Sequence, residues 1–386
     1  MLGIIQEQHP DRCRLFMQWK QMSWPILVDS LNLTGIDVVP LTYAIDEHGV
    51  VRYVRPTLEE VTAFVATDYE APVVSGGEGK GRDRGPVAVE RPDLEVLEAE
   101  TRAGTAAAWT RYADAAFMWG GEELIDRTVE AYESALRLDG GQDGRLQFRL
   151  GTAYRRRYET SARRSGDFSQ AVERWARALD IDPNQYIWRR RIQQYGPRLD
   201  KPYPFYDWVD EARREIVARG ETPPRLRVEP GGAEIAQPAE FFVAARTEGV
   251  EPDPGGRIIR DPGDFINVET AVVPPVLRPG EVARVHLVMR PNVGIKAHWN
   301  NEVEPLRVWI TPPAGWATDS QSLSVPNPPE LVSTETREVQ FELRGPPVGT
   351  GTVPISAYAL YYVCEDVDGT CLYRRQDLDV ALRVEE

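Results

Sequence analysis

The pattern of apolar and polar positions changes character twice along the chain, which predicts three structured regions of different kinds. In the first region, short apolar runs at 2–5 and 25–28 read as strands, and residues 11–22 show the three- and four-residue spacing of one helix face. The turn Asp46-Glu47-His48-Gly49 separates the apolar runs 41–45 and 50–54, which predicts a hairpin. A helix is expected from Thr57 to about Ala66.

Helical periodicity dominates residues 99–195, and one segment recurs there. Val129–Leu136 is followed 43 residues later by the similar segment Val172–Leu179. The stretch Tyr158–Gly166 is expected to form a long loop between two helices. Further helices are expected at 185–194 and 207–219. Because one such unit cannot bury its apolar face alone, we expect the units to stack.

The last region, 220–386, is rich in proline and glycine and contains alternating runs typical of strands. Strands are predicted at 282–288, 306–310, 339–343, 353–362 and 378–384. Turn signals between them favour an antiparallel β-sandwich. The chain as a whole is therefore predicted to be a multidomain α+β protein. Its parts are an α/β piece at 1–70, a flexible linker at 71–98, a helical domain at 99–225, a connector at 226–264 and the sandwich at 265–386.

Composition narrows the possible partners. The chain has 386 residues and a formal net charge of −15, which argues against nucleic-acid binding, since phosphate contacts need clustered cations. No stretch approaches the ~18 apolar residues of a membrane helix, so no direct membrane span is expected. No secretory leader is visible at residue 1. The sequence as given therefore predicts a cytoplasmic protein, or a periplasmic one if the true start lies upstream.

Two arginine runs stand out on the predicted helices, at 155–157 and 189–191. We expect them to form a solvated face paired with nearby acids, with an anion or acidic-peptide site as the alternative. The four histidines lack metal-ligand spacing, and no phosphate-binding loop or serine nucleophile motif is present. Neither a metal nor a cofactor is predicted.

Two of the three cysteines lie close together in sequence. Cys364 and Cys371 flank the turn signal Asp368-Gly369, and on facing strands their Cα atoms would lie roughly 4.5–5.5 Å apart. That separation permits a disulfide. The acidic residues Glu365, Asp366 and Asp368 disfavour a thiolate, although Arg374 and Arg375 would partly offset them. The pair therefore fits a disulfide that a partner attacks better than an attacking dithiol.

A fixed bridge that only staples the hairpin is the alternative for this pair, and it would contribute about 2–3 kcal/mol. The third cysteine, Cys13, is expected to be a small buried apolar side chain.

Residues 35–51 resemble the second half of a thioredoxin or redoxin domain, and the resemblance covers about 1–70. It implies that Pro40, preceded by Val39, is the cis-proline beside the active site of that fold. Such a domain carries a Cys-x-x-Cys motif, which this sequence lacks. The resemblance therefore implies a partial or truncated thioredoxin-like domain whose own nucleophile is absent.

The helical region is similar to the tetratricopeptide repeat, which binds protein partners. The matching residues are Leu150, Gly151, Tyr154, Ala171, Trp175, Ala178 and Pro183. The candidate partner-binding residues are Tyr154, Trp175, Trp188, Arg189 and Arg190. For the aromatic residues between 186 and 208, we expect that they seal the stack against the next domain, with a peptide groove as the alternative.

The C-terminal region resembles the N-terminal, immunoglobulin-like domain of the DsbD thiol:disulfide interchange proteins. The resemblance rests on Leu277–Glu281, Pro305–Val308, Pro312–Trp316 and the cysteine hairpin, whose spacing is one residue longer than in that family. It implies that Cys364 and Cys371 relay electrons between a membrane thiol–disulfide protein and thioredoxin-like partners.

Together these patterns predict a thiol–disulfide exchange or redox-associated protein with a partner-binding helical module. Whether the chain is itself an enzyme stays open. The alternative is a non-catalytic interaction scaffold with a structural disulfide.

Overall fold

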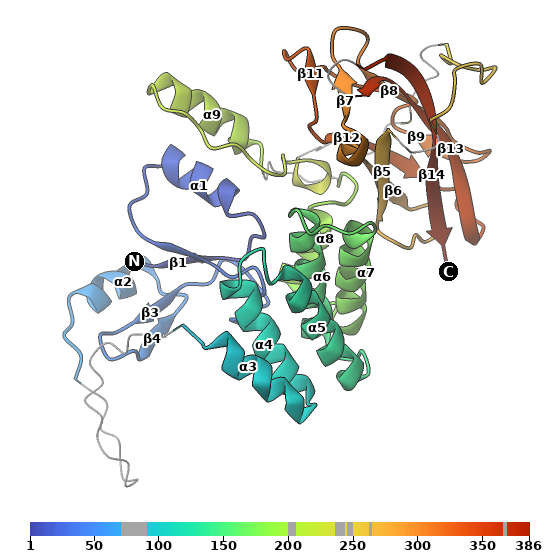
Figure 1. The fold of residues 1–386 in the computed structure, drawn as a ribbon. Coiled ribbons are helices and arrows are strands. Elements are labelled where there is room, and N and C mark those ends of the chain that lie inside the picture. Colours follow the sequence, from blue (N-terminus) through green and yellow to red (C-terminus); the bar gives the residue numbers. More distant parts are fainter. Residues whose placement is uncertain (71–90, 200–205, 236–243, 245–249, 262–264, 366–368) are drawn as a thin grey trace.

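The computed structural model describes residues 1–70, 91–199, 206–235, 244, 250–261, 265–365 and 369–386. Within these residues the chain is a mixed α and β structure, with nine α-helices and an antiparallel β region in the last third (Figure 1). Most of the predicted linker, 71–90, and parts of the predicted connector lie outside the described residues.

The first 70 residues form the elements that their pattern predicts. Strand β1 (Gly3–Ile5) pairs in parallel with β2 (Ile26–Val28), and helix α1 (Pro10–Trp19) connects them. Strands β3 (Tyr43–Ile45) and β4 (Val51–Val54) form the expected hairpin. The carboxylate of Asp46 closes its turn by accepting from the backbone amides of His48 and Val50. Helix α2 (Leu58–Val65) begins at Thr57, which forms a capping box with Glu60.

This region buries little of its apolar surface. The strands form two separate two-stranded sheets, and α2 has no buried residue. Large apolar side chains stay exposed on all four strands: Ile4, Leu27, Val28, Tyr43, Ile45, Val51 and Val54. The free energy gained by packing here is therefore small, since hydrophobic stabilisation scales with the apolar area removed from water.

The middle region is a stack of helices in which each contacts the next (Figure 1). They are α3 (Leu94–Glu100), α4 (Ala106–Trp119), α5 (Ile125–Asp139), α6 (Gly144–Tyr158), α7 (Asp167–Ile181) and α8 (Tyr186–Gln193). The two copies of the recurring segment lie on α5 and α7. The predicted loop is confirmed, because α6 ends at Tyr158 and α7 begins at Asp167.

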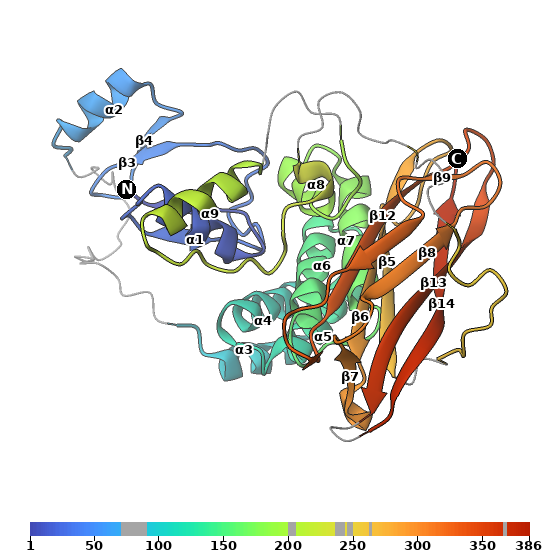
Figure 2. The ribbon, with the colours of Figure 1, turned by 90° about the horizontal axis from the view of Figure 1, so that it is seen from above.

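Helix α9 (Trp208–Ala218) packs against α1 from the start of the chain, and not against the stack (Figures 1 and 2). Leu15 and Trp19 of α1 share a buried cluster with Val209, Ala212 and Ile216 of α9. The sequence division had placed these two helices in different regions.

The β region contains two antiparallel sheets. The first has the order β5 (Ile266–Val273), β6 (Val282–Pro291), β12 (Arg337–Arg344) and β9 (Ala317–Thr318). The second has the order β10 (Ser322–Val325), β8 (Leu306–Thr311), β13 (Gly351–Glu365), β7 (Ala297–Asn300) and β11 (Val332–Ser333), and β14 (Cys371–Val384) also pairs with β13. The five predicted strands correspond to β6, β8, β12, β13 and β14. The described chain also has 3-10 turns at Thr101–Ala103, Gly232–Glu234 and Val293–Ile295.

The two sheets share one buried cluster, to which Leu287 of β6, Phe341 of β12 and Val363 of β13 belong. The outer face of β5 and β6 packs against the helical stack (Figure 2). Ala271, Val273 and Val288 belong to the cluster of the stack, and the ring centroids of Phe168 and His286 lie 5.2 Å apart. The helical stack and the sheets are therefore joined by apolar packing.

Candidate functional site

Cys364 and Cys371 form a disulfide across the antiparallel pair β13–β14. They face each other in the register that begins at Gly351 and Val384, and their Cα atoms lie 4.0 Å apart. This separation is close to the ~4.5 Å of a non-hydrogen-bonded pair in an antiparallel ladder. The predicted bridge between facing strands is confirmed.

The bridge lies on the outer face of its sheet. Side chains alternate between the two faces of a strand, and Tyr361 and Val363 point into the shared core. Cys364 and Tyr362 therefore point outward. The ring of Tyr362 stacks on Tyr373 of β14 with centroids 4.4 Å apart, two register positions from the disulfide and on the same face of the sheet. A flat aromatic pair thus adjoins the bridge.

The two sulfur-bearing residues differ sharply in accessibility. Cys364 is 2% exposed, whereas Cys371 is an exposed residue. A thiol from another molecule would therefore meet Cys371 first, and Cys364 would be the leaving group. The difference in exposure thus distinguishes the sulfur that can be attacked from the sulfur that would leave, which the spacing of the two cysteines in the sequence could not do.

A histidine that the sequence analysis considered only as a metal ligand lies beside the bridge. Strand β7 pairs with β13 on the side away from β14, and His298 is the register partner of Cys364. Directly opposed residues have Cβ atoms about 4.5–5.5 Å apart. The His298 Nδ1 atom lies 3.3 Å from the carbonyl oxygen of Lys296, so Nδ1–H donates in that arrangement and Nε2 keeps its lone pair.

The structure describes only some of the charged residues that were predicted to surround the disulfide. Glu365 is exposed, and Asp366 and Asp368 lie outside the described residues. Arg375 forms ion pairs with Asp253 at 3.0 Å and with Asp377 at 2.8 Å, so it does not offset the acidic loop as expected.

The N-terminal candidates lie far from this bridge, toward the opposite end of the molecule (Figures 1 and 2). The peptide bond between Val39 and Pro40 is cis, and both residues are exposed. Cys13 is free and half-buried, and burial raises the pKa of its thiol, which makes it a weaker nucleophile at neutral pH.

Three of the predicted partner-binding residues are core residues instead. Tyr154, Trp175 and Trp188 are 6%, 0% and 3% exposed. The Tyr154 hydroxyl donates to Glu133, and the ring of Trp188 stacks on Phe148 at 5.6 Å. These three side chains pack the helices together, and they are too buried to contact a bound peptide. Tyr203 and Phe205 of the predicted aromatic cluster lie outside the described residues.

The arginine runs differ from the predicted solvated face. Arg189 is exposed and donates to the carbonyl of Pro183, and Arg190 is half-buried and lies 3.3 Å from Gln193. However, Arg155, Arg157 and Arg191 are buried. They stay charged inside the protein because each finds partners there, such as Asp167 for Arg157 at 2.6 Å.

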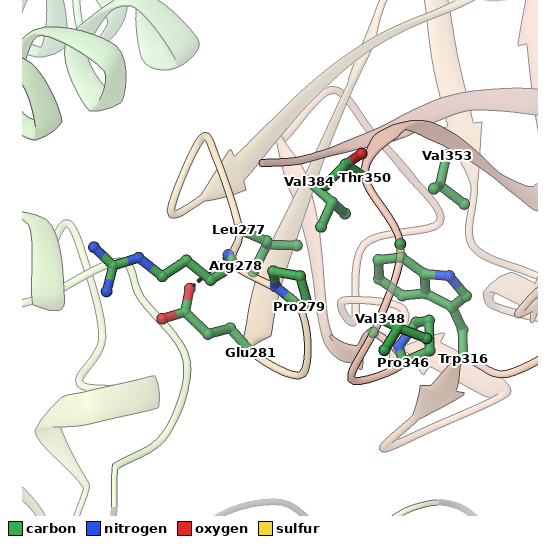
Figure 3. A pocket seen from close by; sticks show the side chains of 12 residues that line it. Leu277, Arg278, Pro279, Glu281, Trp316, Pro346, Val348, Thr350, Val353 and Val384 are labelled. Atoms are coloured by element: carbon green, nitrogen blue, oxygen red, sulfur yellow. Dashed lines mark hydrogen bonds between the residues drawn. The ribbon is translucent and has the colours of Figure 1, made fainter. Parts of the chain in front are cut away.

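A small pocket opens at the other end of the β13–β14 hairpin (Figure 3). Leu277, Trp316, Val353 and Val384 are among the residues that line its 90 Å³. That volume is well below the ~300–1,000 Å³ of small-molecule sites. The eleven positions between Val353 and Cys364 also place it roughly 35 Å from the disulfide.

Among the described residues, no helix combines the length and the apolar character needed to cross a lipid bilayer. The same residues contain no group of three or more histidine, cysteine or carboxylate side chains arranged to hold a metal ion.

Comparison with protein-family models gives no match, and neither does comparison with curated proteins. Among solved structures, the chain is similar to the sporulation control protein Spo0M from Bacillus subtilis, with 12% identity and a TM-score of 0.16 over 32% of this chain and 50% of that one. It is also similar to AvmM, which catalyses macrocyclization in alchivemycin A biosynthesis, with 15% identity and a TM-score of 0.19 over 33% of this chain and 95% of that one. The bacterial hydrophobin BslA gives 15% identity and a TM-score of 0.16 over 31% and 95%. The match spans half of the Spo0M chain, and similarity this weak supports no functional conclusion.

Proposed function

We propose that the chain takes part in thiol–disulfide exchange through the Cys364–Cys371 bridge. The observation that carries this proposal is the pairing of an exposed Cys371 with a Cys364 that is 2% exposed, on the outer face of a sheet. An entirely buried staple would leave no sulfur for another protein to attack. Here one sulfur-bearing residue is accessible and the other is shielded.

The exchange would proceed through a mixed disulfide. A thiolate of a partner dithiol attacks Sγ of Cys371, the bond to Cys364 breaks, and Cys364 leaves as a thiolate that takes up a proton. The second thiolate of the partner then attacks the partner's own sulfur in the mixed disulfide and releases Cys371. The partner dithiol is oxidised to a disulfide, and the bridge is reduced to two thiols by the same two electrons.

His298 is placed to assist the leaving group. It is the register partner of Cys364 on β7, away from Cys371 and from the path of an attacking thiol. Nε2 of the imidazole would relay a proton from solvent to the departing thiolate, and protonating the leaving group speeds exchange.

The hairpin would keep its shape in both redox states. Backbone pairing of β13 with β14 is continuous from Gly351–Val384 to Cys364–Cys371, so the ladder holds the two cysteines opposite each other without the S–S bond. A bond that closes so short a loop adds only about 2–3 kcal/mol. A redox carrier needs this property, because it must fold in both forms.

The proposal extends to the chain's organisation: a partial thioredoxin-like piece, a tetratricopeptide-like stack and a DsbD-like sandwich. The paired, successive helices α4–α7 and the two sheets around one core support it. The exposed apolar strands of the first 70 residues fit an incomplete thioredoxin-like sheet. The partner would be a protein dithiol, either thioredoxin-like or part of a membrane thiol–disulfide protein.

The test is the reduction potential of the bridge, measured by equilibrating the full chain with dithiothreitol buffers and trapping free thiols by alkylation. An exchangeable pair is expected above about −300 mV. A value well below that limit would reject the exchange role.

Such a low value would support the second candidate, a non-catalytic interaction scaffold with a structural disulfide. The burial of Cys364 is the observation that favours it.

A further inference from the structure

A cavity of about 390 Å³ lies where the helical stack meets the sheets, away from the disulfide. Its wall combines the C-terminal end of α6, the segment 225–228, and residues of β6 and β12. Five arginines line it: Arg155, Arg163, Arg225, Arg227 and Arg290. Only two acidic residues, Glu159 and Glu338, are among its lining residues. The cavity is thus strongly cationic in a protein whose formal net charge is −15.

Arg155 is a buried cation held in a fixed position. It is 5% exposed, and its guanidinium carbon lies 4.3 Å from the ring centroid of Phe168 and 4.8 Å from that of Tyr195. Within the described residues, its only side-chain hydrogen bond runs from Nε to Glu159 at 3.1 Å. No acceptor for its two terminal nitrogens is found in the described part of the chain.

Other polar groups in the wall also lack partners. Arg290 pairs with Glu269 through Nη1 at 2.7 Å, but its buried Nε has no acceptor in the described chain. The hydroxyl of Tyr158, which is 4% exposed, has the Arg290 guanidinium as its polar neighbour but no hydrogen-bond partner of normal geometry among the same residues. Buried polar groups are normally satisfied, and a group that is not satisfied points to a missing water, ion or ligand.

The remaining arginines stand at the mouth of the cavity. Arg163 and Arg225 are exposed, and no ion pair of either is found among the described residues; Arg163 donates through Nε to the carbonyl of Thr160 at 3.2 Å, a bond that does not involve its terminal nitrogens. Arg227 reaches Glu159 at 3.6 Å. Arginines gathered around a hollow with low-dielectric walls focus a positive potential into it and recognise planar carboxylates and phosphate oxygens.

From these observations we propose that the cavity binds a small organic anion that carries at least two negative charges. The volume lies within the ~300–1,000 Å³ of small-molecule sites. Arg155 would supply the fixed donor at the base, and Arg163 and Arg225 would close over the charged groups. Arginines recognise clustered anionic oxygens, and both a polyphosphate and a polycarboxylate carry such oxygens.

Isothermal titration calorimetry of the full chain with pyrophosphate and, separately, with citrate tests the proposal at constant ionic strength. We expect saturable binding of at least one probe, and the tighter of the two identifies phosphate or carboxylate as the preferred group. Arg163→Gln and Arg225→Gln should each weaken binding roughly tenfold, the effect of one charge-assisted hydrogen bond. Both residues are exposed, so the variants should unfold at the same temperature as the parent without the probe.

Arg145→Gln is the matched control, because Arg145 is an exposed arginine at the other end of α6. It should bind both probes like the parent. Absence of binding by both probes, an equal loss in the Arg145 variant, or a signal reproduced by chloride would each overturn the proposal. The disulfide does not enter this experiment, so its outcome is independent of the exchange role.

Discussion

Gly151 of α6 lies so close to Trp175 of α7 that no larger residue fits between them. A Cβ at position 151 would stand 2.7 Å from the indole ring and 2.9 Å from the carbonyl oxygen of Ala171. The indole of Trp175 is itself fully buried. The absence of a side chain at 151 therefore sets how closely these two helices approach.

Gly151→Ala should destabilise the helical stack by about 1–3 kcal/mol, because overpacking of a close helix contact outweighs the ~1 kcal/mol that alanine gains in helix propensity. Urea denaturation followed by circular dichroism measures the change. Gly196→Ala is the control, since its Cβ would have no neighbour closer than 3.6 Å. Equal stability of the Gly151 variant and the parent would show that the contact is looser than described.

Asp167→Asn should cost about 2–3 kcal/mol, because it removes the buried charge partner of Arg157 and leaves only the more exposed Asp126, 3.0 Å from its guanidinium. The side chains of Asp167 and Arg157 are 2% and 6% exposed and 2.6 Å apart. Glu130→Gln removes an acceptor of the exposed Arg127 and should change stability by less than about 1 kcal/mol. Thermal unfolding of both variants makes the comparison, and similar losses in the two would contradict it.

Stability should fall in mild acid through His286. Burial, together with the nearby Arg284, lowers the pKa of His286 to about 3. Its Nε2 donates to the carbonyl of Tyr195 at 2.7 Å, and Arg155 also faces it. The unfolded chain takes up the proton near pH 6.5, so the stability that depends on a neutral ring is present above that pH and is lost as the pH falls toward 3.

Between pH 7.5 and 5.0 the parent should therefore lose about 2 kcal/mol more unfolding free energy than His286→Gln. Urea titrations of both proteins at the two pH values measure the difference. His9, whose pKa burial also lowers, is present in both proteins and cancels in the comparison. Parallel losses in parent and variant would show that His286 is not held neutral.

Removing the disulfide should leave the fold intact. A Cys364→Ala/Cys371→Ala variant is expected to keep its circular dichroism spectrum and to lose about 2–3 kcal/mol of stability. The cross-strand ladder holds the hairpin without the bridge. Loss of the cooperative transition in this variant would mean that the bridge is essential to the sheet.

His298→Gln should slow reduction of the bridge by dithiothreitol roughly tenfold, because the departing Cys364 thiolate loses a neighbouring acid. The free thiols that appear in each protein are trapped by alkylation and counted over time. His48→Gln is the control, since His48 lies in the β3–β4 turn, where Nε2 contacts the carbonyl of Tyr69. Equal reduction rates for the parent and the His298 variant would exclude this role.

The sequence correctly predicted those elements that depend on residues close together in the chain. The β3–β4 hairpin, the capped start of α2 and the cysteine hairpin depend on residues within a few positions of each other, and all three are in the structure. Strand β7 was missed because it is only four residues long, Ala297–Asn300. Because β7 was not predicted, the pairing of His298 with Cys364 was not predicted either.

The burial of Arg155 could not be predicted for a different reason. Its aromatic neighbours Phe168 and Tyr195 come from α7 and from the turn after α8, and nothing in the run 155–157 indicates which arginine faces them. The same applies to Tyr154 and Trp175, because their matches to a repeat pattern do not distinguish a core position from a binding position. Composition and spacing give the secondary structure, but tertiary contacts decide which polar groups become a site.

The packing of α1 against α9 joins the beginning of the chain and residues 208–218 into one structural unit. A protein shortened to begin at residue 91 would carry α9 with Val209, Ala212 and Ile216 uncovered, and we expect it to aggregate. Recombination or gene fusion at the boundary near residue 90 would break this unit. A recombinant or fusion protein that keeps one of these helices would therefore have to keep the other as well.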